Sequence, residues 1–392
     1  MEELRLKRYI AILLCALWML PLFACAQDDA ALENRANYAT ATVSAVGDIY
    51  LTDSMLADAK RPDGSYDFST QFEDVAVALS QAGITLGNFE GNLIGGDFGA
   101  EHGSYPDELA EELYKIGFDF LQTANSYSIF NGLSGLESTK AVIERHGMQA
   151  LGTYINAEDR EKNQVAIRDV NGIRFAFVAF TKGVGNLTIP ADTQCGVDLL
   201  YEDYTSDYSI INEDGIVGVL QKAKESKPDV IIAAVHWGSE NHDEISQTQE
   251  EIADLMLRNG VDAIIGSHSH LVGKVERREV SFEDGTKKEC VIAYDLGDFC
   301  AVEAGEQNTS VILNLEFTRN GNQTVISKVG YTPISAVDRG ENHADRFGVM
   351  VTQTEIELYE GNYYDRVSAQ IYEALLADLE SIRKKIGLDT EE

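Results

Sequence analysis

The sequence predicts an α/β fold: one layered domain followed by a C-terminal helix. From residue 41 onward, short β-rich runs alternate with amphipathic helical stretches, as in proteins whose helices pack on sheets. Hydrophobic residues make up 44% and charged residues 24% of the 392 residues, close to the averages of folded soluble proteins. No internal repeat or low-complexity stretch interrupts the alternation. We therefore expect one continuous domain, not two separable ones.

The first part of the domain is expected to alternate strand and helix. Each expected strand is a short apolar run, and each expected helix carries apolar residues three or four positions apart. One helix opens with Pro106, and another ends at Gly147, which are typical start and stop signals. The expected strands are residues 42–49, 84–89 and 118–124, and the expected helices are residues 72–82, 106–116 and 133–146.

The middle of the chain contains its strongest hairpin signal. Asn171-Gly172 joins two apolar runs, residues 165–170 and 173–180, and this dipeptide favours a tight two-residue turn. Two further helix–strand pairs follow, and the second helix is closed by Gly260. These pairs are helix 213–226 with strand 229–235, and helix 244–259 with strand 263–266.

After residue 271 the pattern becomes antiparallel β, and the chain closes with a long charged helix at about residues 364–386. The expected strands there are residues 274–282, 288–294, 311–318 and 323–332. The predicted organisation is a signal segment at residues 1–25, a tether at 26–40, the domain at 41–335, and a C-terminal extension at 336–392.

The N-terminal 25 residues are typical of a targeting segment. Three basic residues precede an apolar run of about 15 residues, shorter than the roughly 20 that a membrane-spanning helix needs. The run ends in Leu22-Phe23-Ala24-Cys25, which resembles the lipobox of bacterial lipoproteins, so we expect Cys25 to be lipidated. The alternative is an ordinary secretory signal that is cleaved after Ala24 or Ala26. Both interpretations place the mature protein outside the cytoplasm, and the first anchors it to the extracytoplasmic face of the cell membrane.

The charge balance excludes one class of partner. The chain has 31 Lys and Arg against 65 Asp and Glu, a formal net charge of 31 − 65 = −34. Nucleic-acid binding requires a basic surface that contacts phosphates, and this composition does not provide one. We expect no nucleic-acid partner.

Polar residues recur just past the carboxyl ends of the apolar strands, where open α/β sheets bind ligands. Carboxylates and imidazoles from adjacent strand ends form a mixed oxygen and nitrogen site that suits divalent transition metals. In His268-Ser269-His270, alternate residues of an extended segment would point to the same side and share a metal centre. The residues at these strand ends are Asp48, Glu90, Asn125, His236, His268 and His270.

Several short motifs, in this order, resemble those of the CapA-type family of poly-γ-glutamate capsule synthesis proteins, within the calcineurin-like metallophosphoesterase superfamily. The most specific are His236-Trp237-Gly238-Ser239-Glu240 and Gly266-Ser267-His268-Ser269-His270. The others are Gly47-Asp48, Asn88-Phe89-Glu90, Ala124-Asn125 and Tyr294-Asp295-Leu296-Gly297-Asp298-Phe299. The resemblance implies a four-layer αββα sandwich and two divalent metal ions, with manganese, iron and zinc not distinguished. It also implies that Glu90 bridges the two metals, and that the ligands are Asp48, Glu90, His236, His268 and His270.

The sequence departs from the family pattern at one place that bears on catalysis. The pattern Ala-Asn-Asn-His-x-x-Asp reads here with Ser126 for the metal-binding Asn, Tyr127 for the His and Phe130 for the Asp. Asn125 and Tyr127 are the candidate catalytic residues. Neutral Tyr donates a hydrogen bond but is a poor proton shuttle at neutral pH, because its ordinary pKa is near 10.

Two functional hypotheses follow from the resemblance and its departures. The first is an extracytoplasmic, metal-dependent phosphoesterase-like enzyme acting on cell-envelope or capsule material. The alternative is a non-hydrolytic component of poly-γ-glutamate biosynthesis or export that uses a degenerate fold. A third interpretation, a structural relic, is weaker because five ionisable ligands are costly to bury with no metal.

The expected partners follow from these hypotheses. They are the cell membrane through the N-terminal lipid, a capsule polymer or phosphate-ester substrate, and other capsule-synthesis membrane proteins. Two polar segments, residues 95–105 and 183–212, are candidates to frame the substrate pocket, although ordinary surface loops explain them equally well.

Overall fold

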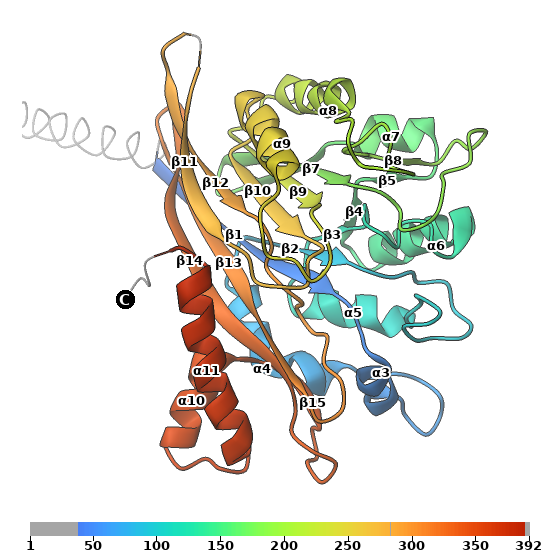
Figure 1. Ribbon diagram of the computed structural model, residues 1–392, viewed down its shortest axis with the longest axis vertical. Coiled ribbons are helices and arrows are strands. Elements are labelled where there is room, and N and C mark those ends of the chain that lie inside the picture. Colours follow the sequence, from blue (N-terminus) through green and yellow to red (C-terminus); the bar gives the residue numbers. More distant parts are fainter. Residues whose placement is uncertain (1–37, 283, 389–392) are drawn as a thin grey trace, which may run out of the picture.

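Two β-sheets packed face to face form the centre of the molecule (Figure 1). The computed structural model describes residues 38–282 and 284–388; the predicted signal segment with Cys25, and most of the tether, lie outside these residues. The seven-stranded sheet has the order β15 (Phe347–Val351), β14 (Gln323–Asp338), β13 (Gln307–Asn320), β1 (Tyr38–Ile49), β2 (Ile84–Phe89), β3 (Phe120–Gln122) and β4 (Gln149–Leu151). The six-stranded sheet has the order β11 (Val275–Ser281), β12 (Lys287–Ala293), β10 (Ala263–Ser267), β9 (Val230–His236), β7 (Ile173–Thr181) and β6 (Ala166–Val170).

Helices cover the outer face of each sheet, and the alternation of side chains along the strands explains why. In β9, Ile232 packs between the two sheets, whereas its neighbours Ile231 and Ala233 pack under the helices. The helices over the six-stranded sheet are α8 (Glu213–Glu225) and α9 (Gln247–Arg258). Those over the seven-stranded sheet are α3 (Asp53–Ala59), α4 (Ser69–Ser80), α5 (Asp107–Lys115) and α6 (Gly132–Arg145). The expectation of a four-layer αββα sandwich is confirmed.

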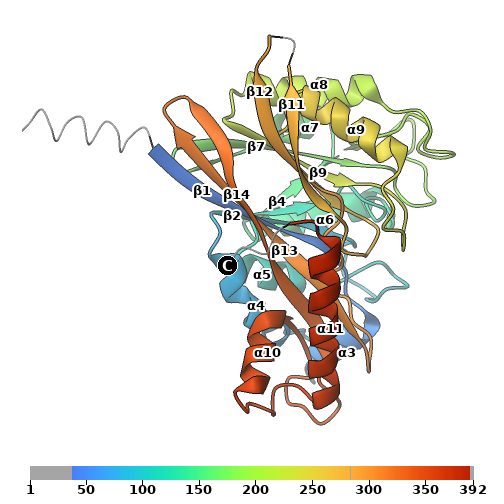
Figure 2. The same ribbon diagram turned by 60° about the vertical axis from the view of Figure 1, so that its left-hand side comes forward.

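The C-terminal helices cover the part of the inner sheet face that the second sheet leaves open (Figure 2). On β14, Ile334 packs toward the outer helices, and Val337 packs on the opposite face with α10 (Thr352–Glu360) and α11 (Ala369–Lys385). Near the end of the chain, Ile382 reaches the core between the sheets. No helix among the described residues is long and apolar enough to cross a membrane.

The two sheets converge at the carboxyl ends of their central parallel strands. Strands β1 to β4 run parallel, as do β7, β9, β10 and β12. Asp48 forms a parallel bridge with Asp298, and the Asp48 N–H donates to the Gly297 O over 2.9 Å. A Cβ on Gly47 would collide with that same Gly297 oxygen, so glycine is required for this approach. Polar residues at the strand ends are thereby brought together.

Most expected elements form, and the differences have local causes. The hairpin β6–β7 turns at Asn171 and Gly172, both with positive φ. Strand β3 is shorter than expected, because the N–H groups of Thr123 and Ala124 both donate to the Leu151 O. Strand β12 pairs parallel with β10 as well as antiparallel with β11, so the expectation of a purely antiparallel region there was wrong.

The last helix was predicted at residues 364–386, but it begins later, at Ala369. Ser368 caps α11 by accepting a hydrogen bond from the Ile371 N–H, so the helix begins at the next residue. The elements that the sequence did not predict are β4, β15, α3, α10, α7 (Ala157–Asn163) and the pair β5 (Thr153–Tyr154) and β8 (Gly196–Val197).

Candidate metal centre

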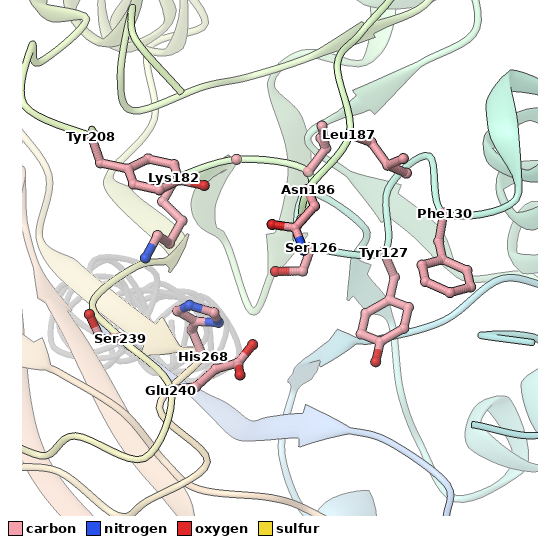
Figure 3. A pocket seen from close by; sticks show the side chains of 13 residues that line it. Ser126, Tyr127, Phe130, Lys182, Asn186, Leu187, Tyr208, Ser239, Glu240 and His268 are labelled. Atoms are coloured by element: carbon pink, nitrogen blue, oxygen red, sulfur yellow. The ribbon is translucent and has the colours of Figure 1, made fainter. Parts of the chain in front are cut away.

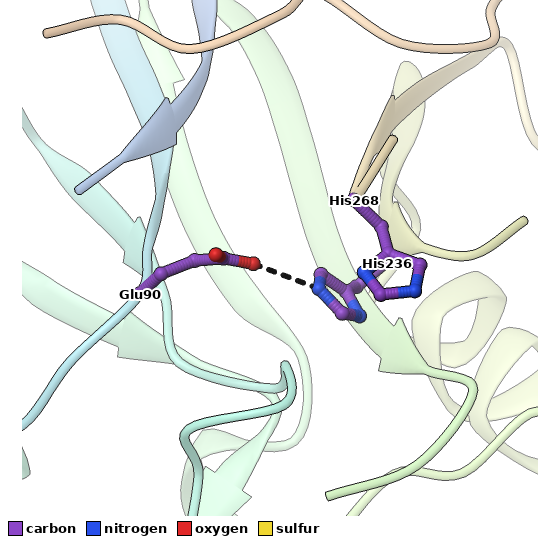
Figure 4. Close-up of side chains that lie close together, drawn as sticks. All are labelled: Glu90, His236 and His268. Atoms are coloured by element: carbon purple, nitrogen blue, oxygen red, sulfur yellow. Dashed lines mark hydrogen bonds and ion pairs between the residues drawn. The ribbon is translucent and has the colours of Figure 1, made fainter. Parts of the chain in front are cut away.

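The five expected metal ligands lie together where the two sheets converge. They form two groups, and in each group the candidate ligand atoms lie within 4.8 Å of one another. Glu90 belongs to both groups, at the end of β2 and only 2% exposed. One group contains Glu90, His236 and His268 (Figure 4), and the other contains Asp48, Glu90 and His270.

A buried asparagine holds the two carboxylates in place. The Asn88 side chain donates to Asp48 Oδ1 over 2.7 Å and to Glu90 Oε1 over 3.2 Å. Because successive residues of β2 point to opposite faces, Asn88 and Glu90 lie on the same side. The amide thus spaces two negative groups that would otherwise repel.

His236 presents one defined ring nitrogen to the centre. Its Nε2 lies 2.8 Å from Glu90 Oε1, and its Nδ1 lies 3.2 Å from Thr181 Oγ1. The Thr181 hydroxyl donates to the Gly183 O, so it accepts from Nδ1–H and leaves the Nε2 lone pair facing the site. Burial, followed by the charges of Lys182 and His270, lowers the pKa of His236 well below its ordinary value. A neutral imidazole with a free lone pair is the form that binds metals.

His268 and His270 occupy unusual backbone conformations. Their φ angles are +112° and +63°, a region that non-glycine residues seldom adopt. Two hydrogen bonds hold this bend: the His268 N–H donates to Asp48 Oδ2 over 3.2 Å, and the Ser269 N–H donates to Asp295 Oδ2 over 2.6 Å. Strain of this kind is concentrated at functional sites. The expectation of an extended segment was wrong, and the two imidazoles serve different groups joined by Glu90.

His270 is paired with carboxylates. Its Nδ1 lies 2.7 Å from Asp298 Oδ1 and 3.5 Å from Asp48 Oδ2. Burial opposes a charge on this ring, but the hydrogen bond to Asp298 and the nearby carboxylates outweigh it and raise the pKa of His270 to about 10. Burial also lowers the pKa of His268, whose ring centroid lies 4.2 Å from that of His236.

The centre contains more negative than positive charge. Asp48, Glu90, Asp295 and Asp298 are buried together, and burial is the main cause that raises the pKa of each carboxyl group. While no metal is bound, protonated His270 supplies positive charge within this cluster and Lys182 supplies it nearby; a metal ion held by His270 would replace the ring proton. Buried carboxylates without matching cations are costly. This excess of negative charge, beside two neutral imidazoles, fits divalent metal ions.

Comparison with known protein families matches residues 42–303 to the family described as bacterial capsule synthesis protein PGA_cap. The chain belongs to this family. The expected resemblance to CapA-type proteins is therefore confirmed, and the matched segment contains all five candidate ligands.

Two relatives of this PGA_cap chain have descriptive names. The capsule biosynthesis protein CapA of Bacillus anthracis is 26% identical over 268 residues, covering 66% of this chain and 59% of the relative. The PGA biosynthesis protein CapA of Bacillus subtilis (strain 168) is 24% identical over 216 residues, covering 55% and 51%. The chain thus spans between half and three fifths of the length of these relatives.

Among solved structures, the PGA_cap chain is similar to a putative 5′-nucleotidase from Staphylococcus aureus, with a TM-score of 0.45 and 14% identity over 74% of this chain and 54% of that one. It is also similar to the calcineurin-like phosphoesterase YfkN from Bacillus subtilis, with a TM-score of 0.44 and 14% identity over 76% of this chain and 90% of that one.

The two candidate catalytic residues of the PGA_cap chain lie at different distances from the open site. Asn125 is buried, and its amide donates to Asn88 Oδ1 over 2.9 Å and to the Phe89 O over 2.7 Å. Its Oδ1 accepts from the Tyr127 N–H, so Asn125 supports Asn88 and positions Tyr127. The Tyr127 side chain lines a cavity beside the centre, and burial, with the Glu90 charge, raises its pKa.

This cavity has a volume of about 660 Å³ and opens next to His268 (Figure 3). The segment 183–212, a candidate to frame the pocket, contributes part of its wall, whereas residues 95–102 line other hollows. The cavity is lined by Ser126, Tyr127, Phe130, Lys182, Gly183, Val184, Gly185, Asn186, Leu187, Tyr208, Ser239, Glu240 and His268.

Sequence reasoning missed several residues of the site. Asn88, Asp295 and Asp298 stood within recognised motifs but were not given a role. Lys182 directly follows β7, so the rule that singled out the other strand ends applies to it equally. Its backbone N–H donates to the His236 O over 2.8 Å, which places it beside a candidate ligand.

Proposed function

We propose that this PGA_cap protein is a metal-dependent phosphoesterase-like hydrolase acting on cell-envelope or capsule material. The observation that carries the proposal is the pair of ligand groups joined by Glu90, beside a cavity that His268 lines. Capsule material is suggested by the family and by the names of the two relatives.

In this proposal Glu90, His236 and His268 would hold one divalent ion, and Asp48, Glu90 and His270 would hold a second. When bound, such ions draw negative charge from phosphate oxygens and lower the pKa of water. Asp298 would orient His270 through its hydrogen bond, and Thr181 would orient His236, since outer partners of this kind set ring direction and tautomer.

The remaining residues hold protons and the substrate. Tyr127 keeps the proton on its Oη at neutral pH, because the ordinary pKa of Tyr is near 10 and burial raises it further, so it donates a hydrogen bond without acting as a proton shuttle. Asn125 holds the Tyr127 backbone, and Ser126 contributes a small hydroxyl to the same wall. Hydrolysis on such a wall would be slow, since proton transfer to the leaving group lacks a residue of suitable pKa.

This slow chemistry favours one alternative: a non-hydrolytic component that binds capsule polymer such as poly-γ-glutamate and assists its assembly or export. The supporting observation is the same pair, Ser126 and Tyr127, where the family pattern has Asn and His. Appreciable turnover by the wild-type protein would exclude this alternative.

We further propose that Cys25 carries a lipid and holds the protein on the extracytoplasmic face of the cell membrane, near other capsule-synthesis membrane proteins. The support is the sequence of the first 25 residues alone. Substitution Cys25→Ala is expected to move the protein from the membrane fraction to the soluble fraction. An unchanged distribution would contradict the anchor.

The test of the hydrolase proposal is metal content measured together with turnover. Purified protein dialysed against Mn²⁺, Fe²⁺ or Zn²⁺ is expected to retain about two ions per chain, the number of ligand groups that share a bridging carboxylate. The same samples are then assayed on a panel of phosphate monoesters and diesters. Protein that retains no metal would overturn the proposal.

A further inference from the structure

The cavity beside the metal centre has two chemically different sides. Figure 3 shows Lys182 and Tyr208 on one side and Tyr127 and Phe130 on the other, with Ser126 and Asn186 between them. A cavity with convergent polar groups on one wall and apolar groups on another orients a ligand that has both characters.

Lys182 gives the first side its positive charge. Among the described residues that line the cavity, it is the one cationic side chain, and Glu240 is the one carboxylate. Within the described part of the chain Lys182 forms no ion pair. Its Nζ donates to the Gly238 O over 2.6 Å and lies 4.6 Å from the centroid of the Tyr208 ring. A half-buried ammonium held by a carbonyl and an aromatic face keeps donors available for an anion.

Backbone conformation and close packing fix the position of the Tyr208 ring. Its φ of +51° is uncommon for a bulky residue, and its ring packs edge-on against Tyr201 at 5.7 Å. A Cβ on Gly183 would lie 3.2 Å from the Tyr208 ring, so the glycine leaves room for this close approach. Strained backbone and a fitted glycine indicate that the ring over Lys182 is part of a site.

The opposite side exposes large apolar groups. Phe130 is 44% exposed and Leu187 is 39% exposed, and both line the cavity. The Phe130 ring lies 5.4 Å from that of Tyr127. Single exposed apolar residues need no explanation, but two that line the same cavity give its wall an apolar surface available to a ligand.

A repeated polyanion fits this cavity poorly. Lys182 is one charge, Glu240 lines the same space, and the whole chain carries −34. Each further carboxylate of a polymer, beyond reach of the metal centre, would meet a repulsive field, and the described lining residues offer it no second cationic side chain. A single anionic head with an uncharged, apolar body avoids this repulsion.

We propose that the cavity binds a phosphate monoester with an apolar body, whose anionic head is held by Lys182 beside the metal centre and whose body packs on Phe130 and Leu187. The proposal deepens the proposed function and rests on it, because the metal centre shares the phosphate. Lys182 and the apolar pair are binding residues that determine specificity.

The test uses phosphonates, because their P–C bond is not hydrolysed and binding is read without turnover. Full-length protein loaded with Mn²⁺ is titrated calorimetrically with hexylphosphonate, phenylphosphonate and 2-hydroxyethylphosphonate. The two apolar compounds are expected to bind about tenfold more tightly than the hydroxyethyl compound, as burial of about two methylene groups would give. Whichever apolar compound binds more tightly identifies an aliphatic or an aromatic body, and both results support the proposal.

Two variants separate the two sides. Lys182→Met is expected to lower the affinity for all three compounds by about tenfold, since it removes a charge-assisted hydrogen bond to the phosphonate head. The double change Phe130→Ser with Leu187→Ser is expected to abolish the preference for apolar bodies while the hydroxyethyl compound binds as before. Lys384→Met and Val77→Ser, exposed sites on α11 and α4, are the matched controls, and circular dichroism checks folding.

Three results would overturn the inference. They are equal affinity of wild-type protein for all three compounds, unchanged binding by Lys182→Met, and tighter binding of an oligo-γ-glutamate than of hexylphosphonate. Metal content is measured on the same samples. Protein that takes up no metal overturns the proposed function. Metal-loaded protein whose affinity does not depend on the body of the phosphonate overturns this inference alone.

Discussion

The metal centre and the cavity beside it are neighbours built in different ways. The ligands of the centre stand in family motifs, are held by buried hydrogen bonds, and include two residues with strained backbones. The cavity wall at Ser126, Tyr127 and Phe130 departs from the family pattern and is partly exposed. The comparison teaches that the candidate metal ligands match the expected family motifs and are held rigidly, whereas the neighbouring wall does not match them and is more open.

The largest effect is expected from substitution of Glu90, the residue that both ligand groups of the centre share. Glu90→Gln removes the carboxylate that belongs to both ligand groups, so both sites should lose affinity. We expect metal content to fall from about two ions to less than one, and turnover to fall by about 10³-fold, as for loss of a major charge-stabilising group. Elemental analysis and an ester assay measure both.

Glu289→Gln is the control for this change, because Glu289 is an exposed residue of β12 that pairs with Arg277. If Glu90→Gln retained both metals and full turnover, the centre would not be the site of chemistry, and its contrast with the cavity would disappear.

The second-largest effect is expected when two residues of the cavity wall are changed back to those of the family pattern. The double change Ser126→Asn with Tyr127→His restores the family residues and supplies an imidazole with an ordinary pKa near 6.5. Turnover is expected to rise by about 100-fold, the lower range for general acid–base catalysis, with a new titration near that pKa in the rate profile. Unchanged turnover across the pH range would show that the wall does not limit the reaction.

A third change tests one group of the centre without the other. Asp298→Ala removes the partner of His270 Nδ1, and we expect the affinity for one metal ion to fall by about 10- to 100-fold while the second ion stays bound. Asp298→Asn keeps an acceptor and should have a smaller effect. Titration with Mn²⁺ followed by calorimetry resolves the two sites, and equal loss at both would contradict separate groups.

The smallest effect concerns Asp67, a carboxylate outside both the metal centre and the cavity. Its pKa is lowered, whereas the pKa values of the carboxyl groups in the centre are raised. Asp67 accepts from the Ser69 hydroxyl and N–H at the start of α4 and pairs with Arg61, and these bonds lower its pKa from 3.8 to about 2. The folded pKa is below the unfolded one, so the stabilisation is present above the ordinary pKa and is lost as the pH falls through about 2.

Asp67→Asn should therefore lower the free energy of unfolding at neutral pH by less than about 1 kcal/mol, because the side chain is about half exposed and solvent screens its bonds. The difference should shrink at about pH 3, because the carboxyl of the unfolded wild-type chain, with its ordinary pKa of 3.8, is by then largely protonated. Urea unfolding at both pH values measures it, with the exposed Asp97→Asn as control. A deficit that grows in acid would refute the assigned direction.

The sequence predicted most strands and helices because their periodicity and their Gly, Pro and Asn-Gly signals are local. It also predicted which polar side chains come together, since the rule that polar residues follow buried strands needs only the strand ends; that they bind metal stays a prediction. It did not predict the division of His268 and His270 between two groups, because that division depends on hydrogen bonds that the backbone N–H groups of His268 and Ser269 donate to carboxylates distant in sequence.

Other features of the fold and the site could not be predicted from the sequence for similar reasons. The short strands β4 and β5 carry too few residues to show a period. The role of the Lys182 side chain depends on Gly238 and Tyr208, which reach it through the fold. Its position after β7, by contrast, was visible in the sequence.

The most direct measurement of the central claim is anomalous X-ray scattering from crystals of the protein grown with Mn²⁺. Two peaks are predicted, one on each side of the Glu90 carboxylate: the first near His236 and His268, and the second near Asp48 and His270. Absence of both peaks, or manganese bound only elsewhere on the acidic surface, would contradict the account.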